Sequence, residues 1–370
     1  MLYLHLPFCH SKCIYCDFFS TPLARDMYGN YIDALGLEIA MRSDELNDSP
    51  TSVYIGGGTP SILPMDLAER LLKIITEKVD VSNVKEWTVE MNPEDVTPEL
   101  LDLYASYGVN RISMGVQTFH DITLKKIGRR HSVEQAEQAI EMIRERGFNH
   151  SLDLIYGLPG EGMEQWTESL EKLLEYHPRH FSAYLLSYEP GTALYRMMEQ
   201  GRVTEASEET SIEMYNMLCD KAIQHGYEHY EISNFALPGF RSYHNSRYWT
   251  GTPYLGIGCS AHSFTNGTRK SNPADIKGYI SSIRNGKLFY EEEFETPEEK
   301  LNDVIITSLR TAEGMNTDLL ATFPESVAKE FTNNMNRLIR SGNINLSGNR
   351  LIIPERRWLE ADAIMRELIV

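Results

Sequence analysis

Six short apolar segments, rich in β-branched residues, alternate with amphipathic segments along the first half of the chain, and this alternation constrains the fold more than any other feature. The strand-like segments are 2–6, 53–55, 87–91, 111–114, 152–156 and 181–186. Strands that alternate with helices form a parallel sheet with right-handed crossovers. Because six such units are too few for a closed eight-fold barrel, we predict an α/β fold with a partial (β/α)6 TIM-like barrel.

The segments between the strands carry signals of helix ends. Ser132 precedes an apolar repeat and has Gln135 three residues later, which is the pattern of a capping box. Pro98 stands where another helix would begin, and Gly108 stands where it would end. We therefore predict helices that start near residues 98 and 133.

The rest of the chain changes in composition and pattern. We expect three parts, which are a barrel at 1–235, a connecting region at 236–295 and a C-terminal module at 296–370. The last part reads as helices around a hairpin with strands 343–346 and 350–353, which indicates a winged-helix-like α+β module. Residues 302–370 hold eight basic and nine acidic side chains, so this module lacks the basic face that nucleic acid requires.

Glycine-rich or polar residues follow five successive strands. They are a cysteine loop after the first strand, residues 56–60 after the second, Glu90 at the end of the third, Gln117 after the fourth, and Asp153 in the fifth with residues 156–160 after it. In parallel α/β barrels, the functional side chains gather at the carboxyl ends of the strands. We therefore predict one site built from these five strand ends.

The cysteine loop has the spacing Cys-x3-Cys-x2-Cys, formed by Cys9, Cys13 and Cys16. Such a loop can direct three thiolates to one centre, and three ligands suit a [4Fe-4S] cluster that keeps one iron free of protein. Zinc is the alternative, with His5 or His10 as a fourth ligand, in a binding module without a redox role. The odd number of closely spaced cysteines argues against a disulfide.

Charge and hydropathy bound the partners of the chain. Its 53 acidic and 35 basic residues give a formal charge of −18, which repels nucleic acid and anionic lipid but allows a local basic pocket. No apolar run is long enough for a membrane span, and motif residues begin at Tyr3, so we expect no span and no export signal. We expect a cytoplasmic protein, because a reducing compartment suits thiolate ligands.

Several residues of the predicted site have a functional interpretation and a plainer one. Gly57 and Gly58 lack a β-carbon, which lets the backbone approach a ligand closely, but a strand-to-helix turn needs the same residues. Glu90 can accept hydrogen bonds from ribose hydroxyls, or it is a solvated carboxylate. Arg129 can pair with a carboxylate, or it is a surface charge.

Two tyrosines lie close to the cysteines in the sequence. Tyr3 lies six residues before Cys9 and could stack or hydrogen-bond near a cluster. Tyr15 lies between two cysteines and could form a wall beside adenine. Either ring could simply belong to the core.

The cysteine motif, followed by a βα barrel with a Gly-Gly-Gly-Thr-Pro loop, resembles the radical S-adenosylmethionine superfamily. The resemblance implies that the amine and carboxylate of S-adenosylmethionine chelate the fourth iron, and that an electron from the cluster splits the sulfonium. The cofactor then supplies the difficult chemistry, while the protein binds it, orients it and excludes water.

Whole phrases of the sequence are similar to the oxygen-independent coproporphyrinogen III oxidase family. The phrases are Tyr-x-His-x-Pro-Phe-Cys from Tyr3, Gly-Gly-Gly-Thr-Pro-Ser from Gly56, Arg-Ile-Ser-Met-Gly-Val-Gln from Arg111 and Asp-Leu-Ile-Tyr-Gly-Leu-Pro from Asp153. The similarity covers nearly the whole chain, including the C-terminal module. It implies a cluster on Cys9, Cys13 and Cys16, and contacts to S-adenosylmethionine from Tyr3, Gly57, Gly58, Thr59, Glu90, Gln117, Arg129 and Asp153.

Two departures from those oxidases matter. The oxidases resemble Cys-x3-Cys-x2-Cys-x-Cys, whereas Phe18 stands here in place of the fourth cysteine. They also carry a long N-terminal extension that helps to hold the porphyrin, whereas this sequence begins eight residues before Cys9. We therefore expect no decarboxylation of coproporphyrinogen III, and this oxidase activity is the alternative function.

The segment from His244 to Trp249 matches the His-Asn-x-x-Tyr-Trp signature of HemW-like proteins, paralogues of the oxidases that are regarded as haem chaperones. An imidazole can ligate haem iron, and Tyr248 and Trp249 can pack on a macrocycle. In the plainer interpretation, His244 only forms a hydrogen bond within a loop. Cys259 and His262 are further candidate ligands, and their plainer interpretation is that of ordinary loop residues. The resemblance implies a haem chaperone that passes haem to acceptor proteins, including membrane-bound acceptors through transient contact.

Overall fold

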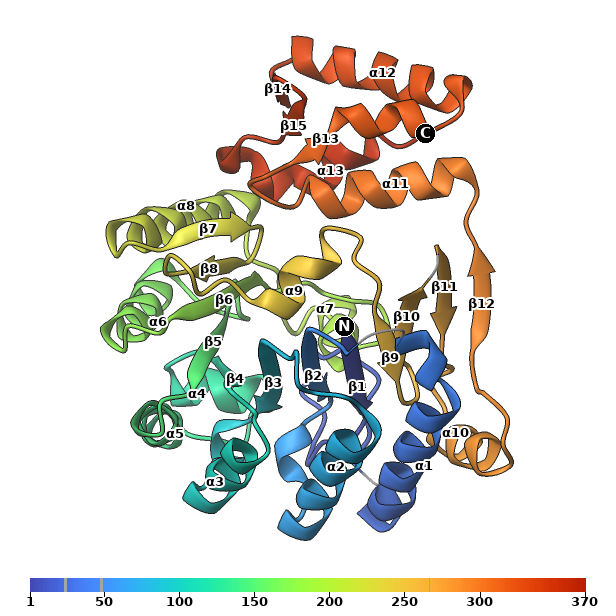
Figure 1. Ribbon diagram of the computed structural model, residues 1–370. Helices are drawn as coiled ribbons and strands as arrows, with labels where there is room; N and C mark the ends of the chain where they lie inside the picture. The colour runs from blue at the N-terminus through green and yellow to red at the C-terminus, as the bar shows by residue number, and fades with distance from the viewer. Residues whose placement is uncertain (23–24, 47–48, 266) are drawn as a thin grey trace. The chain divides into compact units, whose positions relative to one another are not determined.

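The structure is a computed structural model that describes residues 1–370 except 23–24, 47–48 and 266. The chain divides into two compact units, and each unit is built from two stretches of chain (Figure 1). The first unit comprises Met1–Met214 and Pro253–Glu292, and the second comprises Tyr215–Thr252 and Glu293–Val370. Within the described residues, every helix is too short or too polar to cross a membrane.

A parallel sheet forms the centre of the first unit. Its strands are β1 (Leu2–Leu6), β2 (Ser52–Gly57), β3 (Glu86–Met91), β4 (Arg111–Gln117), β5 (Asn149–Tyr156), β6 (His180–Leu185) and β9 (Leu255–Ile257). They lie in the order β6-β5-β4-β3-β2-β1-β9, and each neighbouring pair is parallel. The first six strands therefore lie side by side in chain order, which confirms the predicted α/β fold and its succession of βα units.

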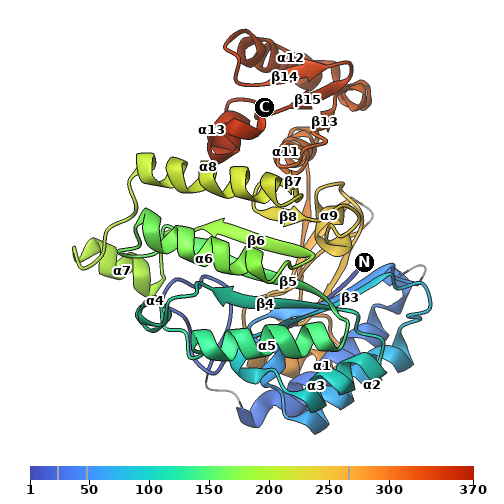
Figure 2. The same ribbon diagram turned by 90° about the vertical axis from the view of Figure 1, so that its left-hand side faces the viewer.

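Helices follow the strands of this sheet. They are α1 (Tyr28–Met41), α2 (Met65–Lys78), α3 (Pro98–Ser106), α4 (Asp121–Lys126), α5 (Val133–Glu145), α6 (Met163–Glu175), α7 (Ala193–Glu199) and α10 (Ile276–Arg284), with the 3-10 segments η1 (Arg25–Met27), η2 (Ser43–Leu46), η3 (Pro60–Ile62) and η4 (Pro93–Asp95). Figure 2 shows α5 and α6 in front of the sheet, so they cover its outer face. The helix α8 (Glu208–Gln224) begins in the first unit and ends in the second.

The predicted helix ends are confirmed. The Ser132 hydroxyl accepts a hydrogen bond from the Gln135 amide at 3.2 Å, and the Gln135 side chain accepts one from the Ser132 amide at 2.9 Å. This capping box starts α5. Pro98 is the first residue of α3, and Gly108 takes a φ of 93° just after it ends.

Apolar side chains between the sheet and the helices form the core of the first unit. Strand residues such as Leu4, Ile112 and Leu152 have no exposed surface, and neither do Ile140 of α5 and Leu170 of α6. Burial of an aliphatic side chain of this size stabilises a fold by about 1.5–3 kcal/mol. The alternation of strands and amphipathic helices in the sequence is the pattern that this core requires.

A buried carboxylate explains why the stretch 253–292 belongs to the first unit. Glu38 of α1 accepts hydrogen bonds from the Gly258 amide at 2.8 Å, the Tyr279 hydroxyl at 2.7 Å and the Asn272 carboxamide at 3.1 Å. It also pairs with Arg42 at 3.2 Å, and both side chains are fully buried. Because a buried charge must be paired and hydrogen-bonded, this network fixes α1 to the stretch 253–292. The hairpin of β10 (His262–Thr265) and β11 (Thr268–Ser271) belongs to the same stretch.

The second unit contains the remaining described elements. They are β7 (Glu228–Glu231), β8 (Asn234–Ala236), α9 (Tyr243–Tyr248), α11 (Pro297–Ser308), β13 (Met315–Asn316), η5 (Thr317–Thr322), α12 (Glu325–Arg340), β14 (Asn345–Ser347), β15 (Arg350–Ile352), η6 (Glu355–Glu360) and α13 (Ala361–Arg366), and the short strand β12 (Glu291–Phe294) enters the unit. The strands β14 and β15 form the predicted hairpin, in which Leu346 faces Leu351. Backbone hydrogen bonds of 3.1 Å link Ile232 to Arg310 and Ala312 to Tyr230. These bonds join the two stretches of the second unit.

The compact units differ from the three consecutive parts expected at 1–235, 236–295 and 296–370. Part of the expected connecting region, 253–292, joins the first unit, because β9 pairs with β1 and α10 packs against α1. The preceding stretch, 215–252, joins the C-terminal elements instead. Hydropathy patterns report local structure, and pairing between distant stretches is not visible in them.

Candidate cofactor site at the strand ends

The loop after β1 carries the three cysteines and is fixed by backbone hydrogen bonds. The Cys16 amide donates to the Cys13 carbonyl at 3.2 Å, and the Ile14 amide donates to the Ile127 carbonyl at 3.2 Å. The second bond attaches the loop to the segment that follows α4. The cysteine loop therefore lies among the carboxyl ends of the strands, where the sequence places the site.

The three thiols are not gathered closely around one point. Among the described residues, these cysteines do not form a group whose sulfur atoms all lie within 4.8 Å of one another. Tetrahedral zinc, with Zn–S bonds of ~2.3 Å, would hold its sulfur ligands about 3.8 Å apart. An iron–sulfur cluster distributes its thiolates over several metal atoms, so it accepts wider spacing.

Burial favours the protonated form of the Cys9 and Cys16 thiols when they have no metal. It raises the pKa of Cys9, and it raises the pKa of Cys16 to about 11. Thiolate is the form that binds metal, so loading a cluster releases protons.

The two histidines that the zinc alternative requires have other partners. His5 Nδ1 lies 2.9 Å from the Tyr3 hydroxyl, and His5 Nε2 lies 3.1 Å from the carbonyl oxygen of Phe19. His10 Nε2 lies 3.2 Å from the carboxylate of Asp95. Either histidine would have to break such a contact to become a fourth zinc ligand. Tyr3, which the sequence analysis assigned to the cofactor, holds the His5 ring through its hydroxyl.

Hydrogen bonds link two cysteines of the loop to each other through three side chains. The Thr59 hydroxyl donates to Cys9 Sγ at 3.5 Å, and the Asn92 carboxamide donates to the Thr59 hydroxyl at 3.2 Å. Arg129 Nη2 donates to the Asn92 carboxamide oxygen at 2.7 Å, and Arg129 Nη1 donates to Cys13 Sγ at 3.8 Å. This network thus places a donor on the sulfur of Cys9 and another on the sulfur of Cys13.

Arg129 is a partly buried element of the site and not a freely exposed surface charge. Its Nη2 also donates to the carbonyl oxygen of Gly115 at 2.8 Å. Its Nε is buried, and the described residues provide it with no hydrogen-bond acceptor. A buried donor without an acceptor destabilises a protein, so we expect a polar ligand to accept this hydrogen bond. This orphaned donor fits an anionic or oxygen-rich cofactor.

Glu90 is oriented by two donors. Its carboxylate accepts a hydrogen bond from the Tyr54 hydroxyl at 2.7 Å and another from the Gly57 amide at 3.0 Å. A carboxylate has room for further donors, so ribose hydroxyls could still bind. Burial raises the pKa of Glu90 to about 7, which poises the group between its neutral and charged forms near neutral pH.

The glycines after β2 are required by neighbouring protein atoms. A β-carbon on Gly57, whose φ is 108°, would lie 2.5 Å from the His5 ring. One on Gly58 would lie 2.5 Å from the carbonyl oxygen of Phe8. One on Gly56 would lie 2.7 Å from the Glu90 carboxyl carbon. The glycines therefore let the loop pack against β1 and β3, which is a role the sequence analysis did not anticipate.

Gln117 and Asp153 also lie where the sequence analysis placed them. Gln117 has a φ of 71° beside an irregular pairing of β4 with β5, a conformation that is uncommon for a residue with a side chain. Asp153 accepts hydrogen bonds from Ser113 at 3.3 Å and Ser151 at 3.4 Å. Burial raises its pKa, and the buried guanidinium of Arg111 opposes that rise.

Tyr15 packs against apolar side chains. It is partly buried against the cluster of Ile127, Ile155 and Leu158. Burial raises the pKa of its hydroxyl, so the phenol stays neutral. The ring thus has a core role, and its remaining exposed surface is compatible with a wall beside a cofactor.

Sequence reasoning missed Asn92 and Tyr54. Asn92 connects Thr59 to Arg129, and Tyr54 positions Glu90. Asn92 was visible as a polar residue directly after β3. Tyr54 gave no signal, because it lies inside the predicted strand 53–55.

His244 lies in α9 of the second unit and is fully buried. Its Nε2 is 3.0 Å from the Tyr248 hydroxyl, and the two rings meet edge to face at 5.2 Å. The indole N–H of Trp249 is buried, and the described residues offer it no acceptor. The plainer interpretation of His244, a hydrogen bond within its own segment, therefore describes this state of the protein.

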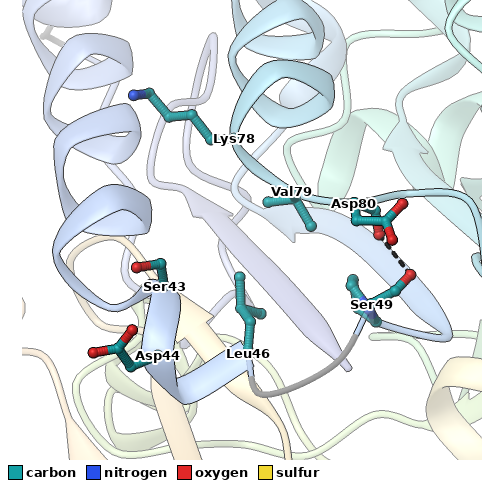
Figure 3. Close-up of a pocket in the computed structure, with 8 residues that line it drawn as sticks. Ser43, Asp44, Leu46, Ser49, Lys78, Val79 and Asp80 are labelled. Atoms are coloured by element: carbon teal, nitrogen blue, oxygen red, sulfur yellow. Dashed lines mark hydrogen bonds between the residues drawn. The ribbon is translucent and has the colours of Figure 1, made fainter.

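A surface hollow of the first unit lies at the other end of the strands. Figure 3 shows its lining, which includes Ser43 and Leu46 from before β2 and Lys78 and Asp80 from before β3. The Ser49 hydroxyl donates to the carbonyl oxygen of Asp80 at 2.7 Å. No residue of the cysteine loop lines this hollow, so the hollow is not part of the candidate cofactor site.

Two comparisons define the class of the protein. Residues 3–173 match the Radical SAM superfamily. A solved structure titled as coproporphyrinogen III oxidase (HemN) from Escherichia coli, a radical SAM enzyme, matches with a TM-score of 0.85 and 22% identity, over 100% of this chain and 89% of that chain. With the cysteine loop at the strand ends, the fold and the site define a radical SAM protein.

Curated relatives narrow this class. Heme chaperone HemW from Lactococcus lactis is 40% identical over 78% of this chain and 76% of the relative. The HemW of Bacillus subtilis is 37% identical over 85% and 84%, and that of Mycobacterium tuberculosis is 31% identical over 100% and 94%. The chain belongs to the HemW family.

Proposed function

We propose that this protein is a haem chaperone of the radical SAM family, and that it binds a [4Fe-4S] cluster, S-adenosylmethionine and haem. One observation carries the proposal. A chain of the HemW family combines the three-cysteine loop with the segment 244–249, whose histidine, tyrosine and tryptophan are suited to a macrocycle.

The first unit supplies the residues for the cluster and S-adenosylmethionine. Cys9, Cys13 and Cys16 would bind the cluster, which contributes one-electron chemistry when bound. Glu90 would accept hydrogen bonds from ribose hydroxyls. The Nε of Arg129, which has no acceptor among the described residues, would donate to S-adenosylmethionine. This donor supports the proposal that S-adenosylmethionine binds at the strand ends. The remaining proposed contacts are Tyr3, Tyr15, Gly57, Gly58, Thr59, Gln117 and Asp153.

The second unit supplies the residues for haem. His244 would bind the haem iron once its Nε2 leaves the Tyr248 hydroxyl, so haem binding would require a local rearrangement of α9. The buried indole N–H of Trp249 could then donate to a haem propionate. Both features support the proposal because a free donor and an exchangeable hydrogen bond suit a ligand that is bound and released.

The partners follow from this function. We propose that the protein passes haem to acceptor proteins, including membrane-bound ones that it contacts transiently. A cytoplasmic location suits the reduced thiols of the cysteine loop. Nucleic acid is not a partner in this proposal, because the formal charge is −18.

A haem titration tests the proposal. Haem added to the protein should give a shifted Soret band, and His244→Ala should alter the band and weaken haem binding about tenfold or more. Tyr248→Phe should bind haem at least as tightly as the wild type, because it removes the hydrogen bond between the Tyr248 hydroxyl and Nε2 of His244. His225→Ala, which changes an exposed histidine of the same unit, is the matched control.

Coproporphyrinogen III is the second substrate to test. The anaerobically reconstituted protein should not convert it to protoporphyrinogen IX. The position after Cys16 that would carry a fourth cysteine is Phe18, which is 65% exposed. Turnover would support the oxidase as the function, and unaltered haem binding in His244→Ala would remove the segment 244–249 from the haem site.

A further inference from the structure

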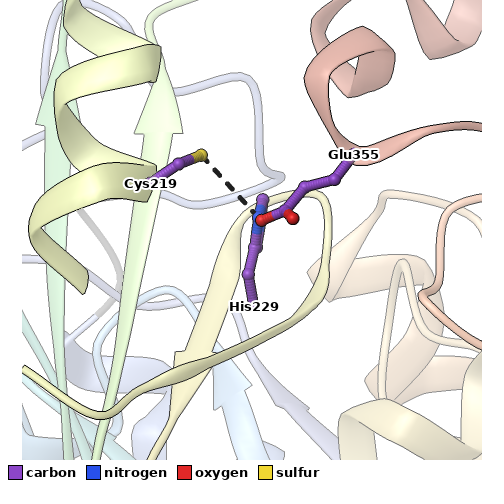
Figure 4. Close-up of side chains that lie close together, drawn as sticks. All are labelled: Cys219, His229 and Glu355. Carbon is purple, nitrogen blue, oxygen red and sulfur yellow. Dashed lines mark hydrogen bonds and ion pairs between the residues drawn. The ribbon is translucent and has the colours of Figure 1, made fainter. Parts of the chain in front are cut away.

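Three side chains with metal-binding atoms meet in the second unit. Figure 4 shows Cys219 of α8, His229 of β7 and Glu355 of η6. Cys219 Sγ lies 3.8 Å from His229 Nδ1, and His229 Nδ1 lies 2.8 Å from Glu355 Oε1. All three ligand atoms lie within 4.8 Å of one another. None of these residues takes part in the functions proposed above.

The second nitrogen of His229 fixes the orientation of the ring. Nε2 lies 3.2 Å from the carbonyl oxygen of Ile232, which can only accept a hydrogen bond. Nε2 therefore carries a proton, and a neutral ring presents the lone pair of Nδ1 to Cys219 and Glu355. A hydrogen bond from the free ring nitrogen to a backbone carbonyl is the usual support of a metal-binding histidine.

Packing holds the ring in this orientation. It stacks on Phe235 with 4.1 Å between ring centroids and meets Trp358 edge to face at 4.5 Å. The His229 side chain is 2% exposed, whereas that of Glu355 is 43% exposed. The ring is thus rigid and buried, and solvent reaches the group from the side of Glu355.

The cluster needs a positive charge between its members. Glu355 can only accept hydrogen bonds when it is ionised, and a neutral ring protonated at Nε2 offers it no proton. The thiol of Cys219 is a weak donor, and burial raises its pKa to about 12. Two arrangements satisfy these groups: an imidazolium paired with Glu355, or a divalent cation bound by all three.

We propose that Cys219, His229 and Glu355 bind a zinc ion, with a fourth position open to solvent beside Glu355. Zinc bonds of ~2.0–2.3 Å in tetrahedral geometry keep ligand atoms about 3.3–3.8 Å apart. The Cys219–His229 separation of 3.8 Å already fits, and a small rotation of the exposed Glu355 would lengthen its contact. Thiolate and imidazole favour zinc over magnesium or calcium.

Zinc binding is measured on the full-length chain with Cys9, Cys13 and Cys16 replaced by Ala, because those thiols also bind metal. Equilibrium dialysis should find one bound zinc per chain. Cobalt in its place should give a thiolate-to-cobalt charge-transfer band. The cobalt spectrum is recorded on a chain whose second unit carries no substitution. It therefore tests the proposal even if a substitution in the second unit impairs folding.

Variants then assign the ligands. Cys219→Ser should remove the charge-transfer band, and Cys219→Ser and His229→Ala should each weaken zinc binding by about tenfold or more. Cys259→Ser and His225→Ala are matched controls that should change neither. Glu355→Gln should weaken zinc binding and keep the band, whereas Glu360→Gln on the same segment should behave like the parent.

Two results would overturn the proposal. One is a cobalt spectrum without the thiolate band, and the other is a zinc affinity that Cys219→Ser leaves unchanged. Either would leave an imidazolium–carboxylate pair beside a neutral thiol. Haem binding is read separately in each variant, and cluster loading is read for the same substitutions in a chain that keeps Cys9, Cys13 and Cys16, so the outcome for zinc is independent of the proposed function.

Discussion

Arg129 donates to the Asn92 carboxamide oxygen at 2.7 Å, and this bond joins the side chain that reaches Cys13 to the pair that reaches Cys9. The two cysteines belong to one loop, but their hydrogen-bonding partners come from the ends of β2 and β3 and from the segment after α4. The electrostatic environment of the proposed cluster is therefore set by several βα units together.

Replacement of Arg129 by Lys should weaken binding of S-adenosylmethionine to cluster-loaded protein by roughly 1–3 kcal/mol. A lysine ammonium cannot reproduce the planar fork that reaches Asn92, Gly115 and Cys13 together. Calorimetry on the reconstituted protein measures the loss. Arg130→Lys, at the exposed neighbouring position, should match the wild type, and an equal loss in both variants would contradict the assignment.

Thr59→Val should lower the reduction potential of the cluster. The substitution keeps the shape of the side chain but removes the donor to Cys9 Sγ, and hydrogen bonds to cluster sulfurs favour the reduced state. A redox titration followed by electron paramagnetic resonance gives the potential. Thr76→Val, in the last turn of α2, is the control, and a potential that does not differ between the two variants would exclude this role for Thr59.

Replacement of Cys9, Cys13 or Cys16 by Ala should abolish cluster binding, because the protein provides only these three proposed ligands. Iron and sulfide analysis of anaerobically reconstituted protein provides the measurement. Cys219→Ala and Cys259→Ala should keep the full cluster spectrum. Stoichiometric iron and sulfide in a variant that lacks all three loop cysteines would falsify the iron–sulfur assignment.

Glu90→Ala should weaken binding of S-adenosylmethionine by roughly 1–3 kcal/mol, since it removes an acceptor from a partly buried site. The affinity of the wild type should also fall as the pH decreases through 7, because the pKa of Glu90 is about 7 and only the ionised form accepts from both ribose hydroxyls. Between about pH 8 and pH 6 the loss should be roughly tenfold.

The pH profile of Glu90→Gln separates this carboxylate from other groups of the site. The variant should lose the part of the pH dependence that Glu90 causes. Glu99→Gln, an exposed position on α3, should keep it. Calorimetry gives the affinity for S-adenosylmethionine as a function of pH. If the wild type, Glu90→Gln and Glu99→Gln have the same pH dependence, ionisation of Glu90 does not contribute to binding.

Glu161 should make the protein less stable as the pH rises. Burial raises its pKa to about 7 from an ordinary value of 4.5. The stability contributed by the neutral carboxyl is fully present below pH 4.5 and is lost as the pH rises through 7. The upper limit is about 3 kcal/mol, and solvent screening of the partly exposed side chain reduces it.

Urea unfolding at several pH values tests this effect. Glu161→Gln should have a flatter dependence of unfolding free energy on pH than the wild type, because the amide does not titrate. Glu164→Gln, an exposed position of α6, should follow the wild type. The prediction would be contradicted if the free energy of unfolding rose more between pH 5 and pH 7 in the wild type than in Glu161→Gln.

The succession of strands and helices was predictable because it depends on local patterns. Leu2–Leu6 was predicted and observed without a change of bounds, and the capping box at Ser132 starts α5 as expected. The strand β9 was not predicted, because Leu255–Ile257 is short and its pairing with β1 links distant parts of the chain. Local patterns do not contain such pairings.

The members of the site were predictable to the extent that their chemistry is unusual at a strand end. The thiols of the cysteine loop, Glu90 and Arg129 stood out as groups that a core rarely contains. Asn92 and Tyr54 act through hydrogen bonds to those groups, and only the three-dimensional arrangement reveals them. The buried state of His244 was also not visible, because burial depends on the surrounding elements.

The second unit is assembled from stretches that the ribosome makes at different times. Residues 215–252, which include His244, leave the ribosome well before residues 293–370, while the first unit can be completed when residue 292 appears. The backbone bonds from Ile232 to Arg310 and from Ala312 to Tyr230 can form only after that point. A chain terminated prematurely after residue 292 would therefore retain every residue proposed for the cluster, and it would display the proposed haem segment without the partners that keep it folded.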